Sequence, residues 1–176
     1  VKISKIAISS KEGEAYMNKF DDEKSSNYGD ARIFSEKLKN SECVQVKTLD
    51  NFFYSNCDRK NPVSLIKFDV QGQELEVTIG SEKIIKEYKP FLYLENDNAE
   101  TSKFLIEKIK SLGYVMFWHL PPLFNPDNLL KNPKNIFSNI ISCNMFCVHY
   151  STKITLNEKW KKFQIQNSNF HPFKKK

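Results

Sequence analysis

The sequence predicts an α/β fold with parallel strands, and residues 65–95 carry that prediction. A largely apolar run at 65–70 and a second one at 91–94 each lead to an acid at the carboxyl end, Asp69 and Glu95. The stretch between the two runs has apolar residues at helical spacing. Strand, helix and strand in this order form a βαβ unit with two parallel strands. Ligands of open α/β sheets lie outside the carboxyl ends of the strands, so both acids are expected at the functional edge.

The residues ahead of this unit predict short strands and one short helix. Apolar and polar residues alternate over 1–9, as they do in a half-buried strand. Two further short strands are predicted at 14–18 and 43–46, and a polar loop is predicted between them at 21–30. Thr48 is a candidate N-cap for a helix over 49–54, and Asp50 in the first turn favours the dipole of that helix.

The residues after this unit predict another helix and two more strands. Residues 102–112 have apolar side chains at helical spacing and are followed by Gly113, a typical C-terminal cap. Strands are expected at 114–120 and 144–150, and they should pair as an antiparallel hairpin at the sheet edge because no helix joins them. The irregular stretch between them, 121–138, is rich in Asn and Pro. Its length predicts a lid or a substrate loop.

The composition predicts a single-domain, cytoplasmic protein. With 176 residues, 40% of them hydrophobic, the chain can bury one sizeable core. No apolar run approaches the roughly 20 residues of a membrane span. The start of the chain also lacks the order of basic, apolar and small residues that makes a signal peptide. The four cysteines lack metal-ligand spacing and are expected to be reduced thiols, and no metal site is predicted.

The positive charge of the chain is confined to its end. Residues 153–176 hold seven Lys and one Glu, which accounts for the whole net charge of +6, and residues 1–152 are neutral. We therefore divide the chain into a domain, 1–152, and a basic aromatic tail, 153–176. A solvated, partly disordered end is the structure expected for such a tail. Its mixture of Lys with Trp and Phe could also contact an anionic lipid or a nucleic acid backbone.

Three segments resemble the FkbM family of S-adenosylmethionine-dependent methyltransferases. They read VKTLDNFF at 46–53, LIKFDVQGQELEVTIGSEKIIKEYKPFLYLE at 65–95 and LGYVMF at 112–117. The family carries a TLD segment, a K-x-D-x-E-G-x-E block, a P-x-x-x-x-E strand and a GY strand start, and the sequence at 27–29, Asn-Tyr-Gly, fits its Asn-x-Gly motif. The resemblance covers residues 1–150. It implies a partial class I methyltransferase sheet, which is Rossmann-like, with a terminal antiparallel hairpin.

The sequence also departs from the family pattern. Gln71 stands where the family has Glu, which removes a charge and a possible base, and Gln73 replaces a small residue. The first two strand–helix units of such a sheet, with their Gly-rich turn and ribose-binding acid, have no counterpart. Because the chain also begins at Val1, we expect the C-terminal portion of a larger enzyme, which by itself binds the cofactor weakly or not at all. The open edge of its sheet predicts self-association.

The resemblance implies catalytic and cofactor contacts near the first acid. Asp69 would lie beside the transferred methyl group, where it could orient the acceptor hydroxyl, act as a base or help hold a metal. The alternative is a structural acid that binds the amides of the following turn. Lys67 lies on the same strand face and would pair with it. Gly72 would let the cofactor approach the backbone, and Ser9 and Ser10 would contact the adenine.

Other residues are candidates for catalysis or acceptor binding. Glu95 is a further catalytic candidate, and with Asn96 it ends the second strand, where both could contact the acceptor or hold the first acid in place. Glu74 is implied as a site residue, or it only complements the dipole of its helix. His119 lies near the long loop and could act on substrate, although a lone His is more often structural. Asn125 would suit a polyhydroxylated acceptor because amides donate and accept, with turn chemistry as the alternative.

The predicted function is methyl transfer from S-adenosylmethionine to a hydroxyl oxygen of a small-molecule or glycan acceptor, such as a sugar or a polyketide-like natural product. Catalysis would depend on holding the partners in line, with a base to take the hydroxyl proton. Two rival hypotheses remain. One is a non-catalytic fragment or remnant of such an enzyme, and the other is a module that binds anionic surfaces through the tail. The neutral domain predicts no nucleic-acid partner.

Overall fold

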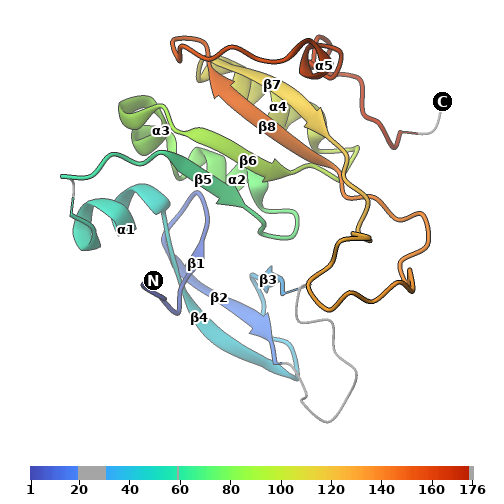
Figure 1. The fold of residues 1–176 in the computed structure, drawn as a ribbon. Coiled ribbons are helices and arrows are strands. Elements are labelled where there is room, and N and C mark those ends of the chain that lie inside the picture. Colours follow the sequence, from blue (N-terminus) through green and yellow to red (C-terminus); the bar gives the residue numbers. More distant parts are fainter. Residues whose placement is uncertain (20–30, 59, 175–176) are drawn as a thin grey trace.

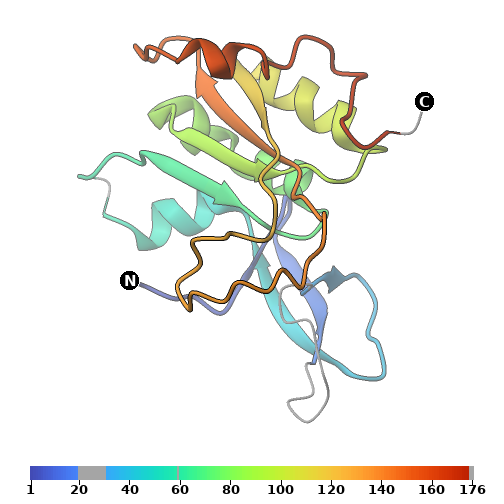
Figure 2. The ribbon, with the colours of Figure 1, turned by 45° about the vertical axis from the view of Figure 1, so that its right-hand side comes forward.

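The computed structural model describes residues 1–19, 31–58 and 60–174. Within them the chain forms two four-stranded sheets and five helices, a mixed α/β architecture (Figure 1). The predicted α/β class is confirmed. The N-terminus lies beside the smaller sheet, and the described C-terminal segment, up to residue 174, lies beside the larger one (Figures 1 and 2). The loop predicted at 21–30, with the Asn-Tyr-Gly motif, lies outside the described residues.

The larger sheet contains the predicted parallel pair. Its strands, in spatial order, are β5 (Leu65–Phe68), β6 (Phe91–Glu95), β8 (Asn144–His149) and β7 (Tyr114–His119). β5 and β6 are parallel over four residue pairs. β7 and β8 pair antiparallel as predicted and end the sheet, but the edge strand is β7, because β8 lies between β6 and β7 and is antiparallel to both. An inner position suits β8, since its Met145 and Cys147 are fully buried.

The segment between β5 and β6 forms two helices where the sequence predicted one. They are α2 (Glu74–Ile79) and α3 (Glu82–Tyr88). Gly80 between them lies against the backbone of Ser9, and a Cβ at this position would be 2.2 Å from the Ser9 carbonyl oxygen. Asp50 then caps the second helix, because its carboxylate accepts from the amides of Lys83 and Ile84, both at 2.9 Å. The sequence indicated only that Asp50 favours the dipole of its own helix.

The main core lies between one face of the larger sheet and the helices α2 and α4 (Ser102–Ser111), which both lie behind the sheet in Figure 1. Strand alternation sends every second side chain of the sheet to this face. The core residues from the sheet include Phe68, Leu92, Leu94, Met116, Met145 and Cys147, and those from the helices include Val77, Ile85, Leu105, Ile106 and Ile109.

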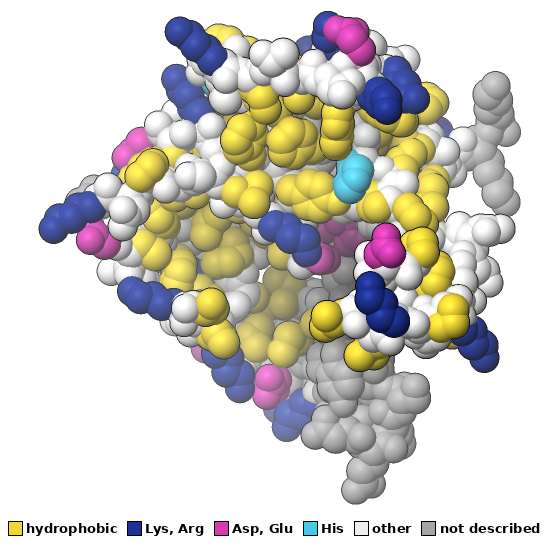
Figure 3. All heavy atoms as spheres, viewed as in Figure 1, with side chains coloured by type: hydrophobic (Ala, Val, Ile, Leu, Met, Phe, Trp, Pro, Cys, Tyr) yellow, Lys and Arg dark blue, Asp and Glu magenta, His cyan; other side chains and the backbone are white. Residues whose placement is uncertain are grey.

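The opposite face of the larger sheet carries aromatic side chains. Phe91 and Phe146 stack with ring centroids 5.6 Å apart. Trp160, from α5 (Glu158–Lys161), lies against Phe117 and Phe146, with centroids at 6.5 and 5.9 Å. Apolar side chains extend over the strands on this side (Figure 3), and Leu65 at the edge is 59% exposed. The described residues therefore cover this face only in part.

The smaller sheet was not predicted as a separate layer. Its strands, in spatial order, are β1 (Ala7–Ile8), β4 (Ser41–Lys47), β2 (Gly13–Asn18) and β3 (Ile33–Phe34). The strand predicted at 1–9 is shorter, because only Ala7 and Ile8 find partners, at the end of β4. The helix α1 (Leu49–Asn56) follows β4. Thr48 Oγ1 accepts from the amide of Asn51 at 3.1 Å, which confirms the predicted N-cap.

The C-terminal segment packs against the larger sheet. The backbone of residues 163–165 is hydrogen-bonded to β7 at 2.9 and 2.8 Å, so it covers the edge of that strand. His171 is 4% exposed and donates from Nε2 to the carbonyl oxygen of Asn96 at 2.8 Å. The end is therefore solvated in part: His171 is buried, whereas Phe163 and Phe170 are 41% and 55% exposed. The division at 152/153 stays a prediction.

None of the helices in the described part of the chain reaches the length and apolar character that crossing a bilayer takes. All four cysteines are free thiols, and Cys143 and Cys147 are buried.

Candidate active site

The carboxyl ends of β5 and β6 bring the two predicted acids to one edge of the larger sheet. Asp69 directly follows β5, and Glu95 is the last residue of β6, which is the parallel neighbour of β5. The Nζ atom of Lys67 lies 2.6 Å from Oδ2 of Asp69, and both side chains are about half exposed. The ion pair expected between these two residues is therefore present, and it is open to solvent.

Gln71 joins the two carboxylates. Its Nε2 atom donates to Oδ1 of Asp69 and to Oε2 of Glu95, both at 3.3 Å. Gln71 has a φ of 50° and Gly72 a φ of 94°, so the turn after β5 runs through the left-handed region. This conformation turns the Gln71 side chain back over the strand ends. A glutamate could not make both contacts, since a carboxylate has no hydrogen to donate.

Glu74 stabilises the same turn through hydrogen bonds to its backbone. The side chain is 7% exposed, and its Oε1 atom accepts from the amides of Val70 at 3.3 Å and Gly72 at 3.2 Å. It also begins α2, where a negative charge complements the helix dipole. The structure thus shows Glu74 supporting the turn that carries Gln71, with its carboxylate directed at the backbone.

Glu95 has an unusual acidity for a carboxyl group. Burial raises its pKa from the ordinary value of 4.5 to about 7. The negative charges of Asp97, Asp69 and Glu74 add to this increase in pKa, and the positive charge of Lys67 opposes it. Protonated and ionised forms of Glu95 therefore coexist near neutral pH. A carboxyl group of this kind can accept a proton in one step and release it in the next.

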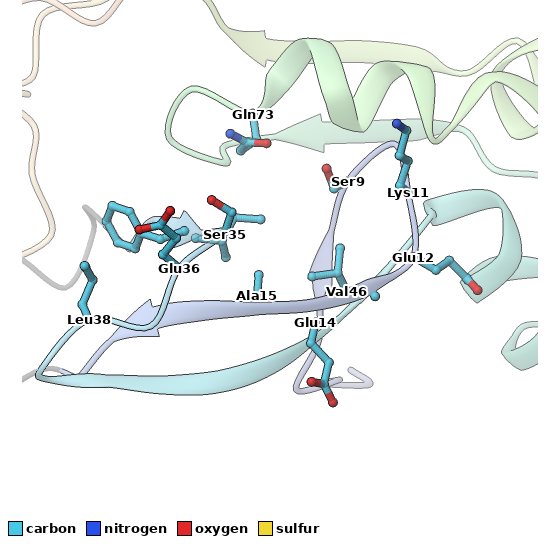
Figure 4. A pocket seen from close by; sticks show the side chains of 13 residues that line it. Ser9, Lys11, Glu12, Glu14, Ala15, Ser35, Glu36, Leu38, Val46 and Gln73 are labelled. Atoms are coloured by element: carbon cyan, nitrogen blue, oxygen red, sulfur yellow. The ribbon is translucent and has the colours of Figure 1, made fainter.

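A cavity of about 680 Å³ lies between the smaller sheet and the turn after β5 (Figure 4). Ser9 directly after β1, Ala15 in β2 and Gln73 directly before α2 point toward this space. Further apolar side chains of its lining come from Ile33, Phe34, Leu38 and Val46. Ser10, the other serine predicted to contact a cofactor, donates its hydroxyl hydrogen to the carboxylate of Glu76. Ser9 is thus the member of the pair that faces the cavity.

Comparison with known families places both regions within one family match. The family model described as the methyltransferase FkbM domain matches residues 4–116, which is more than half of the chain. The chain belongs to the FkbM methyltransferase family. The match includes Ser9 and the whole cluster of Asp69, Gln71 and Glu95, and it ends within β7, before the long loop. No curated protein and no solved structure matches the chain.

In this FkbM domain, Gln71→Glu should raise the pKa of Glu95 further, by about one unit or more. The change replaces two donated N–H bonds with a third negative charge between two carboxylates. NMR titration of the side-chain carboxyl carbons measures the shift. Gln45→Glu, which adds the same charge at an exposed position of β4, should leave the titration of Glu95 in place. An unchanged Glu95 pKa in Gln71→Glu would contradict the bridging role.

Two further candidate residues of this FkbM domain, His119 and Asn96, lie at the same edge of the sheet but differ in how exposed their side chains are. His119 ends β7, and its Nδ1 atom shares a hydrogen bond of 2.8 Å with the Tyr93 hydroxyl, whose pKa is raised by burial. Asn96 is 4% exposed, and its amide donates to Oγ of Ser102 at 2.9 Å. The Asn96 side chain is therefore used inside the fold. Tyr93 was missed by sequence reasoning, and its place two residues before Glu95, on the same face of the strand, was the available signal.

Asn125 lies in the long loop, where Oδ1 accepts from the amide of Asp127 at 2.9 Å. This bond is the turn chemistry that the sequence offered as the alternative to acceptor binding. Among the described residues, no group of three or more His, Cys, Asp and Glu side chains is arranged to hold a metal ion.

Proposed function

We propose that this FkbM domain serves methyl transfer from S-adenosylmethionine to a hydroxyl oxygen of a sugar or natural-product-like acceptor. The observation that carries the proposal is Glu95, a carboxyl group with a pKa of about 7 that Gln71 joins to Asp69 at the carboxyl ends of two parallel strands. Hydroxyl groups need a base when their oxygen attacks a methyl group. The four free thiols are consistent with a reducing compartment and support a cytoplasmic location.

The proposed fold is the acceptor-side half of a class I, Rossmann-like sheet. Its support is the strand order β5-β6-β8-β7, in which one antiparallel strand is inserted before the last parallel one. Ligands bind at the carboxyl ends of the strands in sheets of this class, which agrees with the position of Asp69 and Glu95.

S-adenosylmethionine, when bound, supplies a methyl group on a sulfonium sulfur. Asp69 accepts a hydrogen bond from the acceptor hydroxyl and orients it, and Lys67 holds Asp69 in place through the 2.6 Å ion pair. Glu95 would take the hydroxyl proton onto its carboxylate while the acceptor oxygen receives the methyl group that the bound sulfonium would supply. Holding the reacting atoms in line supplies most of the acceleration.

The cavity beside Ser9 fits part of the proposed cofactor. An adenine ring needs apolar contact on its faces and hydrogen bonds at its edges, which Ala15 and Val46 on one hand and Ser9 and Gln73 on the other can supply. Gly72, adjacent to Gln73, has open space where a side chain would lie, so a ligand can approach its backbone. We assign Ser9 and Gly72 to cofactor contact. Ser10 is less suited, because its hydroxyl is bound to Glu76.

A transfer assay tests this proposal. The protein is incubated with S-adenosylmethionine labelled in the methyl group and with a panel of monosaccharides and polyketide alcohols. We expect label in a product that survives mild alkali, because a methyl ether is stable and a methyl ester is hydrolysed. Label in an alkali-labile product would assign the acceptor atom to a carboxylate and contradict hydroxyl transfer. No transfer to any member of a broad panel would favour the non-catalytic remnant.

A further inference from the structure

The long loop between β7 and β8 is an ordered projection of the fold. Its base is closed by backbone hydrogen bonds from Leu123 to Ile140 at 3.0 Å and from Ser142 to Pro121 at 2.9 Å. In Figures 1 and 2 the loop, drawn in orange, extends away from the larger sheet at the ends of β6 and β7. It therefore leaves the domain at the edge that carries Glu95.

Large apolar side chains of this loop face solvent. Leu129 is 95% exposed and Leu130 is 87% exposed, and Ile136 follows at 68%. Leu123, Phe137, Ile140 and Ile141 are exposed as well. Single exposed apolar residues are ordinary on protein surfaces, but contiguous groups of them mark interaction sites. These exposed apolar side chains all lie within about twenty residues of one loop. They therefore indicate an interaction surface.

Asparagine side chains of the loop form hydrogen bonds with backbone groups of the same loop. The Asn128 side chain accepts from the amide of Asn132 at 3.0 Å and donates to its carbonyl oxygen at 2.8 Å. Asn135 does the same for Phe137 and Ser138, at 2.9 and 2.8 Å. Backbone groups that are already paired lose little when water is removed from around them. The loop is thus built to present leucines to an apolar medium at a low cost in backbone desolvation.

The charges beside the apolar tip are mainly positive. Lys131 directly follows the two leucines, Lys134 comes three residues later, and both are exposed. Asp127 is the single acid between residues 121 and 142, so this stretch holds two Lys and one Asp. Figure 3 shows basic and apolar side chains next to one another over this loop. Apolar residues flanked by lysines are the composition that binds anionic lipid surfaces.

We propose that the loop over residues 121–141 docks the protein on an anionic lipid surface. Leu129 and Leu130 insert below the headgroups, and Lys131 and Lys134 remain among the lipid phosphates. The docked orientation brings the edge with Glu95 toward the membrane. This interaction depends on the loop and not on methyl transfer, so it can be tested without any acceptor.

Co-sedimentation with vesicles tests the proposal on the whole chain. Vesicles of phosphatidylcholine with phosphatidylglycerol are compared with vesicles of phosphatidylcholine alone. We expect the protein to sediment with the anionic vesicles only, and Leu129→Asn with Leu130→Asn to weaken this binding at least tenfold. The matched control is Leu65→Asn with Phe104→Asn, two side chains that are each 59% exposed outside the loop. The control should bind as the unchanged protein does.

Three results would overturn the proposal. One is the absence of binding to anionic vesicles by the unchanged protein. Another is unchanged binding by the Leu129/Leu130 variant together with a loss of binding in Lys159→Gln with Lys161→Gln and Lys162→Gln, which would assign the contact to the C-terminal segment. The third is a concentration-dependent dimer in the absence of lipid that the Leu129/Leu130 variant dissociates, which would make a second copy the partner of the loop.

Discussion

Glu95→Gln is expected to lower the rate of methyl transfer by about 10²–10⁴-fold while leaving the affinity for S-adenosylmethionine unchanged. The amide cannot take the hydroxyl proton, but it has nearly the shape of the carboxyl group and can still contact Gln71. Turnover and cofactor affinity are measured separately, the first with labelled cofactor and the second by calorimetry. Glu100→Gln, an exposed change five residues away, should have no effect on either.

The pH dependence of the rate gives this prediction a second readout. Glu95 works as a base only when it is ionised, so the rate should rise with pH through about 7 and then level off. The residual activity of Glu95→Gln should lack that rise. A full rate in the variant, or the same pH profile in both proteins, would assign the base to another group, with Asp69 as the nearest alternative.

The same substitution should stabilise the protein at alkaline pH. The carboxyl of Glu95 has a pKa of about 7 in the folded protein, above its ordinary value of 4.5, so the folded state holds the proton more tightly than the unfolded chain. That contribution to stability is present below the unfolded pKa and is lost as the pH rises through the folded pKa. Urea unfolding at about pH 5 and pH 8 should therefore show a gain for Glu95→Gln that grows with pH.

Glu74→Ala should cost about 1–3 kcal/mol in the free energy of unfolding, because it leaves the amides of Val70 and Gly72 without their acceptor. It should also reduce methyl transfer, since the turn that carries Gln71 loses its support. Glu74→Gln keeps a carbonyl oxygen at the same place and should retain most of the stability. Urea unfolding of the two variants provides the comparison.

Two outcomes would contradict this role of Glu74. Equal stability losses in the alanine and glutamine variants would mean that the charge, and not the acceptor oxygen, matters. A stable Glu74→Ala protein that fails only in acceptor binding would instead support the direct contact with acceptor that the sequence resemblance implied.

Local patterns were sufficient to predict the parallel unit and its neighbours. The apolar runs at 65–70 and 91–94 became β5 and β6 in parallel register, and the cap at Thr48 formed as its residue type indicates. The break between α2 and α3 could not be predicted, because it depends on the backbone of Ser9, about seventy residues earlier in the chain. The cap that Asp50 provides for α3 is a contact of the same long-range kind.

The acidic residues of the candidate site could be predicted from the sequence, but the contacts between its side chains could not. Acids at the ends of two parallel strands must lie near each other, which is why Asp69 and Glu95 could be named from the sequence. Gln71 read as the loss of a charge, because sequence alone does not reveal the left-handed turn that directs its amide to both carboxylates. The hydrogen bond from His171 to Asn96 was likewise not predicted, because the lysines of the C-terminal segment indicated that it would be exposed to solvent.

Calorimetric titration of S-adenosylmethionine into the protein encoded by the whole reading frame tests the central claim most directly. The account predicts saturable binding of one cofactor per chain, and at least tenfold weaker binding in Ser9→Trp, whose larger side chain fills the cavity between the smaller sheet and the turn after β5. Gln166→Trp, in the C-terminal segment outside that cavity, should bind normally. No heat of binding in the unchanged protein, or full affinity in Ser9→Trp, would contradict the account.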